Sequence, residues 1–239
     1  MGYIGTQKYR DPEIGPVNVT CRQNASSFKA RWKGQVLHVT VPYGMSLEEY
    51  NRIFDSLRTK ILESKPKAFY SFDSRFDFDL FSVSIEPTGP AHPRSHLQQP
   101  DPGSSDWHIF LPDKTNFANH QIEANIAKII KIIAESYFPT VADEASIISE
   151  EIFGHKFDVL PMDGYRTLGH CSSHGLIHLS HALAFFDKDL RRLIICHEFA
   201  HLTHMDHSPA FHRLLDSYMG GRERALERIL KAFAWPVPR

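Results

Sequence analysis

The chain has 239 residues, a formal net charge of −1 and 42% hydrophobic residues. This composition is that of a globular protein and excludes wholesale disorder, and the length suits one large domain or two small ones. No apolar run approaches the ~18 residues of a membrane helix, the N-terminus lacks the apolar segment of a signal peptide, and three cysteines are too few for a disulfide framework. We therefore expect a cytoplasmic protein without a membrane partner.

Charge is unevenly distributed along the chain. Residues 1–70 carry 11 Lys or Arg against 6 Asp or Glu, whereas residues 71–163 carry 6 against 15. Residues 164–239 carry 10 against 7. A basic N-terminal region fits either a plain solvated surface or a phosphate-bearing partner such as nucleic acid. The charge pattern leaves both interpretations open.

Residues 1–112 are expected to form a mostly β region. Strands are predicted from apolar patterning over 17–21, 26–32 and 35–41. A turn at Lys33-Gly34 is predicted to join the last two into a hairpin. Ser46 and Glu49 form a capping box, which predicts a helix from there to about Glu63.

An aromatic-rich segment and a proline-rich segment follow this helix. Residues 69–85 are expected to contain a hairpin, and residues 109–111 a further strand. Residues 86–106 hold five prolines and two glycines, so we expect a long exposed loop there. Such a loop is either a plain insertion or a flap over a site.

Residues 113–239 are expected to form a mostly helical region, either a second domain or a continuation of the first. Apolar periodicity and start signals predict helices over 119–138, 139–153, 187–202, 209–219 and 222–234. Strands are expected within 165–180, with a turn at residues 173–175. The chemistry of the chain lies in this region, because 10 of its 15 histidines fall between His155 and His212.

His197, Glu198 and His201 form an HExxH pattern on a predicted helix. Positions four apart lie on one helical face, so both imidazoles can bind one ion, and Glu198 lies where it can approach a metal-bound water. His207 follows a turn and is expected to complete a three-histidine site. In sequences of this composition, an HExxH pattern is expected by chance in about one of twenty. The same pattern followed by the third histidine is expected by chance in about three of a thousand.

Three protein ligands with an open fourth position are typical of a catalytic zinc site. We expect one Zn²⁺ per chain, held by His197, His201 and His207, with Glu198 taking a proton from zinc-bound water and passing it to the leaving group. Imidazole ligands also accept nickel, cobalt or copper. The alternative interpretation is a buried helix whose histidines only form hydrogen bonds.

Four residues near the motif have alternative interpretations. His204 is either a rival third ligand or an outer residue, and we favour the second. His212 is a candidate for lining the cleft. Asp206 and Asp216 either orient an imidazole or cap helices at the surface, and capping is favoured.

The C-terminal motifs resemble the YgjP-like metallopeptidase family, relatives of the SprT-like and Wss1-like zincins. That family pairs an R-x-x-W-G-S-C-S-x-x-G-x-I-x-L hairpin with HELxHxxxxxHSxxFW, and this chain has RTLGHCSSHGLIHLS at 166–180 and HEFAHLTHMDHSPAFH at 197–212. Residues 26–47 are also similar to the family's opening sheet. Four positions depart from the family pattern, none of them a histidine of the site or Glu198: they are Leu168, His170, Phe199 and His212.

The resemblance implies a zincin-like α+β fold, with an N-terminal antiparallel sheet followed by a helical HExxH region. It places the strand at 176–180 as a sheet edge above the active-site helix, where an extended peptide can add by main-chain hydrogen bonds. Cys171 fits a buried packing residue better than a nucleophile. His178 points either into the cleft or to the surface.

Three functions of different classes follow. The first is a zinc metallopeptidase acting on peptide or protein substrates, in which water activated by Glu198 attacks a peptide carbonyl. The second is a metal-dependent nucleotide pyrophosphatase, an activity also ascribed to members of the family, although the sequence has no Gly-rich phosphate loop. The third is a non-catalytic binding module, DNA-associated or not, whose metal only stabilises the fold. Glu198 argues against the third, because a structural metal site needs no base there.

Overall fold

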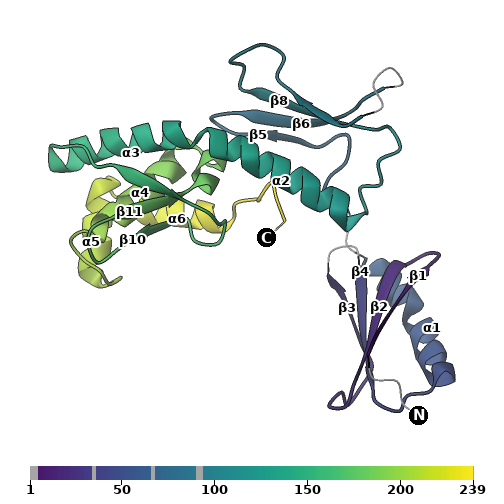
Figure 1. Cartoon of the computed structure of the whole chain (residues 1–239). Helices are drawn as coiled ribbons and strands as arrows, with labels where there is room; N and C mark the ends of the chain where they lie inside the picture. Colours follow the sequence, from purple (N-terminus) through teal and green to yellow (C-terminus); the bar gives the residue numbers. More distant parts are fainter. Residues whose placement is uncertain (1–4, 34–35, 66–67, 90–93, 239) are drawn as a thin grey trace. The chain divides into compact units, whose positions relative to one another are not determined.

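The computed structural model describes residues 5–33, 36–65, 68–89 and 94–238. It divides into two compact units, residues 1–71 with 114–124 and residues 72–113 with 125–239. Strands and helices occur in both units, so the fold is α+β as expected (Figure 1). Among the described residues, none of the helices has the length and apolar character needed to span a membrane.

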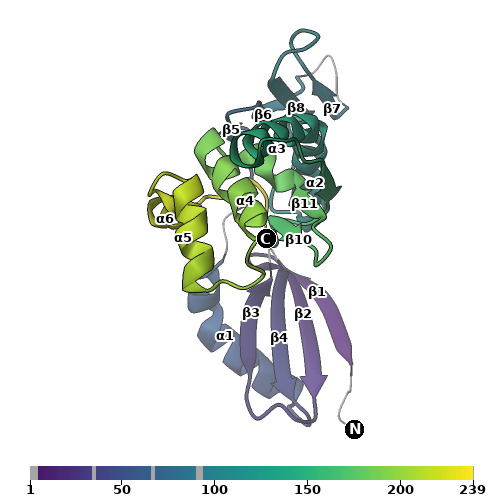
Figure 2. The same ribbon diagram turned by 90° about the vertical axis from the view of Figure 1, so that its left-hand side faces the viewer.

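The first unit is a four-stranded sheet with one helix, α1, against one of its faces (Figures 1 and 2). The strand order is β1-β2-β4-β3. The elements are β1 Thr6–Asp11, β2 Gly15–Arg22, β3 Lys29–Lys33, β4 Val36–Pro42 and α1 Leu47–Glu63. The sheet is mixed rather than antiparallel as predicted, because β2 and β4 run parallel. The predicted β3–β4 pairing is confirmed, although Gly34 of the predicted turn lies outside the described residues.

Buried and more exposed residues alternate along β4, so the two faces of this sheet differ in burial. Leu37, Val39 and Val41 of β4 are buried and pack with Phe54 and Ile61 of α1. The intervening residues of β4 are more exposed and lie on the other face. The predicted helix start is confirmed, since the N-cap side chain accepts a hydrogen bond from the backbone three residues on, 3.1 Å away.

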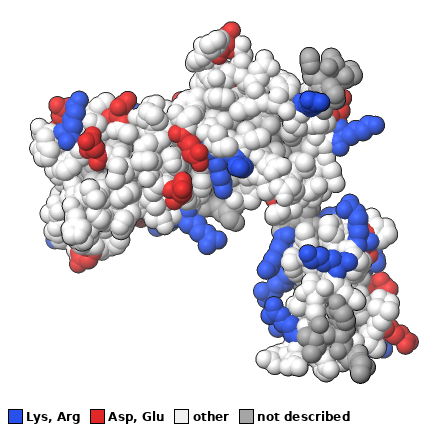
Figure 3. All heavy atoms as spheres, viewed as in Figure 1, with Lys and Arg blue, Asp and Glu red and all other residues white. Residues whose placement is uncertain are grey.

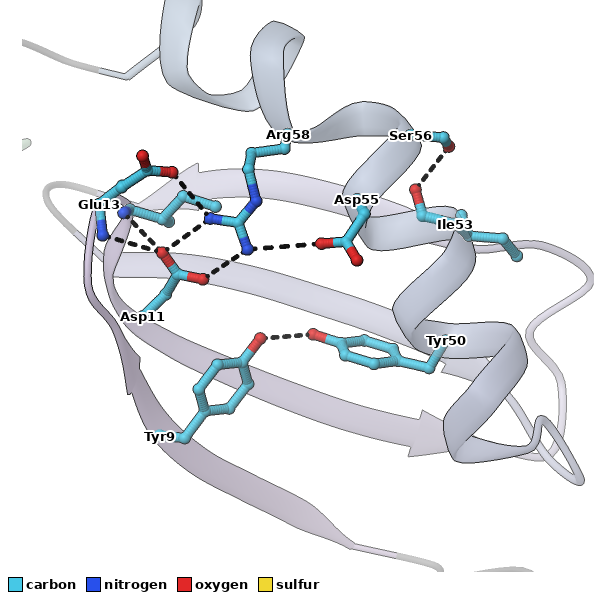
Figure 4. Close-up of polar contacts among 9 residues, drawn as sticks. Tyr9, Asp11, Glu13, Tyr50, Ile53, Asp55, Ser56 and Arg58 are labelled. Atoms are coloured by element: carbon cyan, nitrogen blue, oxygen red, sulfur yellow. Dashed lines mark hydrogen bonds and ion pairs between the residues drawn. The ribbon is translucent and has the colours of Figure 1, made fainter.

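Strand β1 is tied to α1 by polar contacts (Figure 4). Arg58 of α1 lies 2.9 Å from the buried carboxylate of Asp11 and 3.1 Å from Glu13. The hydroxyls of Tyr9 and Tyr50 are 2.8 Å apart. Sequence patterning did not predict β1, because its residues are almost all polar and exposed and these contacts, not apolar alternation, position it.

The second unit holds two further sheets and most of the helices. One sheet has the order β5-β6-β8-β7, with β5 Arg75–Asp77, β6 Ser82–Pro87, β7 His96–Gln98 and β8 Asp106–Leu111. The other has the order β10-β11-β9, with β9 Val159–Met162, β10 Gly169–Cys171 and β11 Ile177–Ser180. The helices are α2 His120–Ser136, α3 Phe138–Phe153, the short 3-10 helix η1 His181–Phe185, α4 Lys188–Ala200, α5 Pro209–Tyr218 and α6 Glu223–Lys231. The predicted helices are confirmed, and the proline-rich segment contains the short strand β7.

Strand β11 is not a sheet edge, which corrects the expectation for the strand at 176–180. It pairs antiparallel with β10 on one side and parallel with β9 on the other. Its backbone is therefore already hydrogen-bonded on both sides, and the edges of this sheet are β9 and β10. The sequence Val-Leu-Pro-Met of β9 has neither alternation nor a run of β-formers, so no pattern predicted a strand there.

Helix α4 is the centre of the second unit, and α3, α5, α6 and β10 pack against it (Figure 2). Asp187 caps its first turn by accepting a hydrogen bond from the Leu190 N–H at 2.8 Å. Arg191 is only 2% exposed and forms two 2.7 Å bonds to the Glu144 carboxylate of α3. Its guanidinium also donates to the carbonyl of Phe186. These contacts fix the HExxH helix against its neighbours.

Candidate metal centre

Three imidazoles meet at the C-terminal end of α4. His197 lies in the last turn of the helix, His201 caps it, and His207 comes just before α5. The Ser208 side chain caps α5 by accepting from the Phe211 N–H, which fixes the point at which the chain turns back. One nitrogen from each of the three histidines lies within 4.8 Å of the other two, and the Nε2 atoms of His197 and His207 are 3.1 Å apart.

This donor set fits a zinc ion. Tetrahedral ligands at ~2.1 Å from zinc lie about 3.4 Å from each other, close to the separation of the His197 and His207 nitrogens. Burial, and to a lesser extent His201 and His207, lower the pKa of His197 to about 4, so this imidazole is neutral at physiological pH. A neutral imidazole is the form that binds a metal.

Two neighbours orient the histidines. The carbonyl of His204 lies 2.9 Å from Nδ1 of His201, an interaction that leaves Nε2 of His201 for the ion. His204 therefore acts through its backbone, and its side chain is not in the cluster. The ring of Phe211 packs against all three imidazoles, with centroid distances of 4.6 to 4.9 Å.

Glu198 follows His197 in α4 and is buried, with 5% of its surface exposed. Burial raises the pKa of its carboxyl to about 7, and a hydrogen bond from the backbone of Cys171 partly offsets the rise. A carboxyl with a pKa near 7 both accepts and releases a proton at physiological pH. The site thus offers three imidazole donors that suit a metal ion and a carboxyl that can exchange a proton at this pH.

Gly169 of β10 makes room for that carboxylate. A Cβ at this position would lie 2.6 Å from Cγ and Oε1 of Glu198 and 2.7 Å from Cδ, far inside ordinary contact distance. Sequence reasoning missed this role, because nothing in the pattern relates a strand glycine to a helix 29 residues on. Cys171 is 6% exposed within the hydrophobic core, which confirms the packing interpretation, and burial and Glu198 raise the pKa of its thiol.

A cavity of about 660 Å³ opens beside His207. Its walls include His207, His212, Arg213, Asp216, Glu223 and Arg224. His212, which the sequence makes a candidate for lining the cleft, lies in the wall of this cavity together with His207. Its Nδ1 lies 2.5 Å from Oε1 of Glu223, a carboxylate that is itself 5% exposed, so this imidazole is held in one orientation.

Of the two aspartates near the motif, Asp216 has the capping role favoured from the sequence, and Asp206 is exposed in the turn before α5. Asp216 accepts a 3.0 Å hydrogen bond from the backbone N–H of Glu223 at the start of α6. Asp206 interacts with Ser208, and this hydrogen bond lowers the pKa of its carboxyl. His178 is half-buried on β11 and lies outside the histidine cluster.

The HExxH helix and its third histidine define the class to which the chain belongs, the metal-dependent hydrolases. More narrowly, it is a member of the YgjP-like family, whose metallopeptidase domain model matches residues 26–232, most of the chain. No curated protein and no solved structure matches the chain significantly.

Proposed function

We propose that this protein is a zinc metallopeptidase. The observation that carries the proposal is the convergence of three imidazoles, whose nitrogens lie within 4.8 Å of one another, at the end of a helix that also holds the buried Glu198 carboxyl. Membership of the YgjP-like metallopeptidase family supports the same reaction class. In this proposal His197, His201 and His207 hold the ion.

A zinc ion held by these three histidines would polarise a substrate carbonyl and make water acidic enough to lose a proton near pH 7. The Glu198 carboxylate would accept that proton, since its pKa near 7 matches the task. It then delivers the proton to the leaving amine nitrogen. His212, held by Glu223, faces the adjoining cavity, where it can donate a hydrogen bond to the substrate.

The edge of β10 that does not pair with β11 is the proposed docking line for an extended peptide, which would use the main-chain groups that Glu198 leaves available. Along a strand, the N–H and C=O groups of successive residues point alternately to the two sides of the strand. Those of Leu168 and Ser172 bond to the β11 side, so the N–H and C=O groups of Gly169 and Cys171 point away from β11. The Cys171 N–H already bonds Glu198 on that side. A substrate strand paired at this edge would therefore lie next to the acid–base group.

The test measures metal content and peptide hydrolysis for the wild type, Glu198→Gln and His207→Ala. We expect about one zinc per chain in the first two, loss of zinc in the third, and new peptide termini carrying solvent ¹⁸O only with the wild type. Hydrolysis by Glu198→Gln at the wild-type rate would refute the acid–base role. Release of pyrophosphate from nucleoside triphosphates without peptide cleavage would replace the peptidase by the nucleotide reaction.

A further inference from the structure

The sheet of the first unit has one face without α1, and that face is basic. Register places the same-face residues of all four strands in rows, such as Lys8, Asn18, His38 and Arg31 across β1, β2, β4 and β3. We name this surface the basic face. Its polar and basic members are Thr6, Lys8, Arg10, Asn18, Thr20, Arg22, Lys29, Arg31, Lys33, His38 and Thr40, and its apolar members, Pro16, Val36 and Pro42, lie at strand ends. No strand residue described on this side is acidic.

The cations of the basic face are uncompensated. All six Lys and Arg side chains are exposed, and none has a carboxylate partner within the described part of the chain. Arg58 on the opposite side of the sheet contrasts with them, because it contacts Asp11, Glu13 and Asp55 (Figure 4). Figure 3 shows Lys and Arg gathered along the border of the first unit where Figure 1 draws β3.

The layout of these side chains suits a row of phosphates. Residues two apart on a strand are ~6.8 Å apart, and four strands are about 14 Å wide, so the six cations share one face of those dimensions. Hydroxyl and amide groups between them, from Thr20, Thr40 and Asn18, are the neutral donors that proteins direct to phosphate oxygens. Partial burial and Lys33 lower the pKa of His38, as expected in a positive field.

We propose that the basic face binds the phosphate backbone of a nucleic-acid duplex. A single strand is disfavoured because such partners need aromatic stacking platforms, whereas Tyr9 and Trp32 lie on the helix side of the sheet. An anionic membrane is disfavoured because the centre of the face offers no apolar side chain for insertion. The basic face belongs to the first unit and the histidine cluster to the second, so this proposal does not depend on the proposed hydrolysis.

The test measures binding of a fluorescent DNA duplex of about 24 base pairs by anisotropy, between about 50 and 200 mM salt. Six phosphate contacts predict a slope of log K against log salt near −5, or roughly a thousandfold loss of affinity over this range. The double variant Lys29→Gln with Arg31→Gln should make the slope shallower by about 2, so that the loss is roughly 60-fold.

A matched control removes two exposed cations from α1, Arg52→Gln with Lys60→Gln. Both double variants change the net charge equally, and thermal melting verifies that both are folded. Retention of the wild-type slope by the control supports the proposal. The proposal would be overturned if both pairs of substitutions weakened duplex binding equally, or if the wild type did not bind the duplex at all. It would also be overturned if the wild type preferred single-stranded DNA, or bound more tightly to phosphatidylcholine vesicles with about 30% phosphatidylserine.

Discussion

Replacing Gly169 by alanine tests whether β10 positions the acid–base group. The new methyl carbon would lie 2.6 Å from Oε1 of Glu198, whereas ordinary contacts begin at 3.4 Å. The carboxylate must therefore move by nearly 1 Å, because its neighbour is strand backbone and Glu198 is the side chain that can yield. The three histidines keep their places, since the substitution does not touch them.

The expected magnitude follows from that displacement. A misplacement of about 1 Å costs on the order of a hundredfold in rate, so Gly169→Ala should lower kcat/KM about a hundredfold at unchanged zinc content. Overpacking beside a buried side chain should also lower the free energy of unfolding by about 1–3 kcal/mol. His170→Ala is the matched control, because His170 is the exposed neighbour on the same strand.

A double-mutant cycle on the metal-free protein isolates the contact. Urea unfolding of the wild type, Gly169→Ala, Glu198→Ala and the double variant gives the coupling energy between the two positions. If the clash is real, Gly169→Ala destabilises the wild-type background and is nearly neutral once Glu198 is alanine. Equal destabilisation in both backgrounds, or full activity of Gly169→Ala, would show that the glycine is needed for another reason.

Three more predictions concern stability. Arg191→Ala should lower the free energy of unfolding by about 3–5 kcal/mol in urea, because it removes the buried partner of Glu144; a loss under 1 kcal/mol would contradict this. Burial raises the pKa of Glu198 to about 7, so its carboxylate destabilises the metal-free fold above that pH and not below about 4.5. The unfolding free energy of the wild type should therefore rise by about 3 kcal/mol relative to Glu198→Gln as the pH falls from 7 to 4.5, and parallel curves would refute the shift. Arg58→Ala should cost about 1–3 kcal/mol because Asp11 loses its partner, whereas no change in the urea midpoint would mean that the pair is neutral.

The sequence predicted those parts of the molecule that depend on local periodicity or on a short motif. The helices repeat apolar residues every three to four positions, and Ser46 and Ser208 have the side chains that cap helix starts. The three histidines could be grouped because two share a helical face and the third follows a turn. The finding that their nitrogens converge rests on the packing of α5 against α4.

The parts that escaped prediction depend on contacts between distant segments. β1 is a strand because it pairs with β2, and Arg58 and Tyr50 of α1 contact its side chains. β9 is a strand because β11 offers it a partner. The position of β11 between two neighbours follows from the same pairing. The basic face needs strand register, which a count of charges along residues 1–70 cannot supply.

The ring of Phe211 has a thermodynamic consequence for ion capture. A residue that touches three imidazoles at once restricts their rotamers during folding, before any ion arrives. Ordering three side chains costs roughly 1.5–4.5 kcal/mol of conformational free energy. Because Phe211 orders the imidazoles when the chain folds, this cost lowers the folding free energy and does not weaken ion binding. The affinity of the centre is set in part by a side chain that offers no ligand atom.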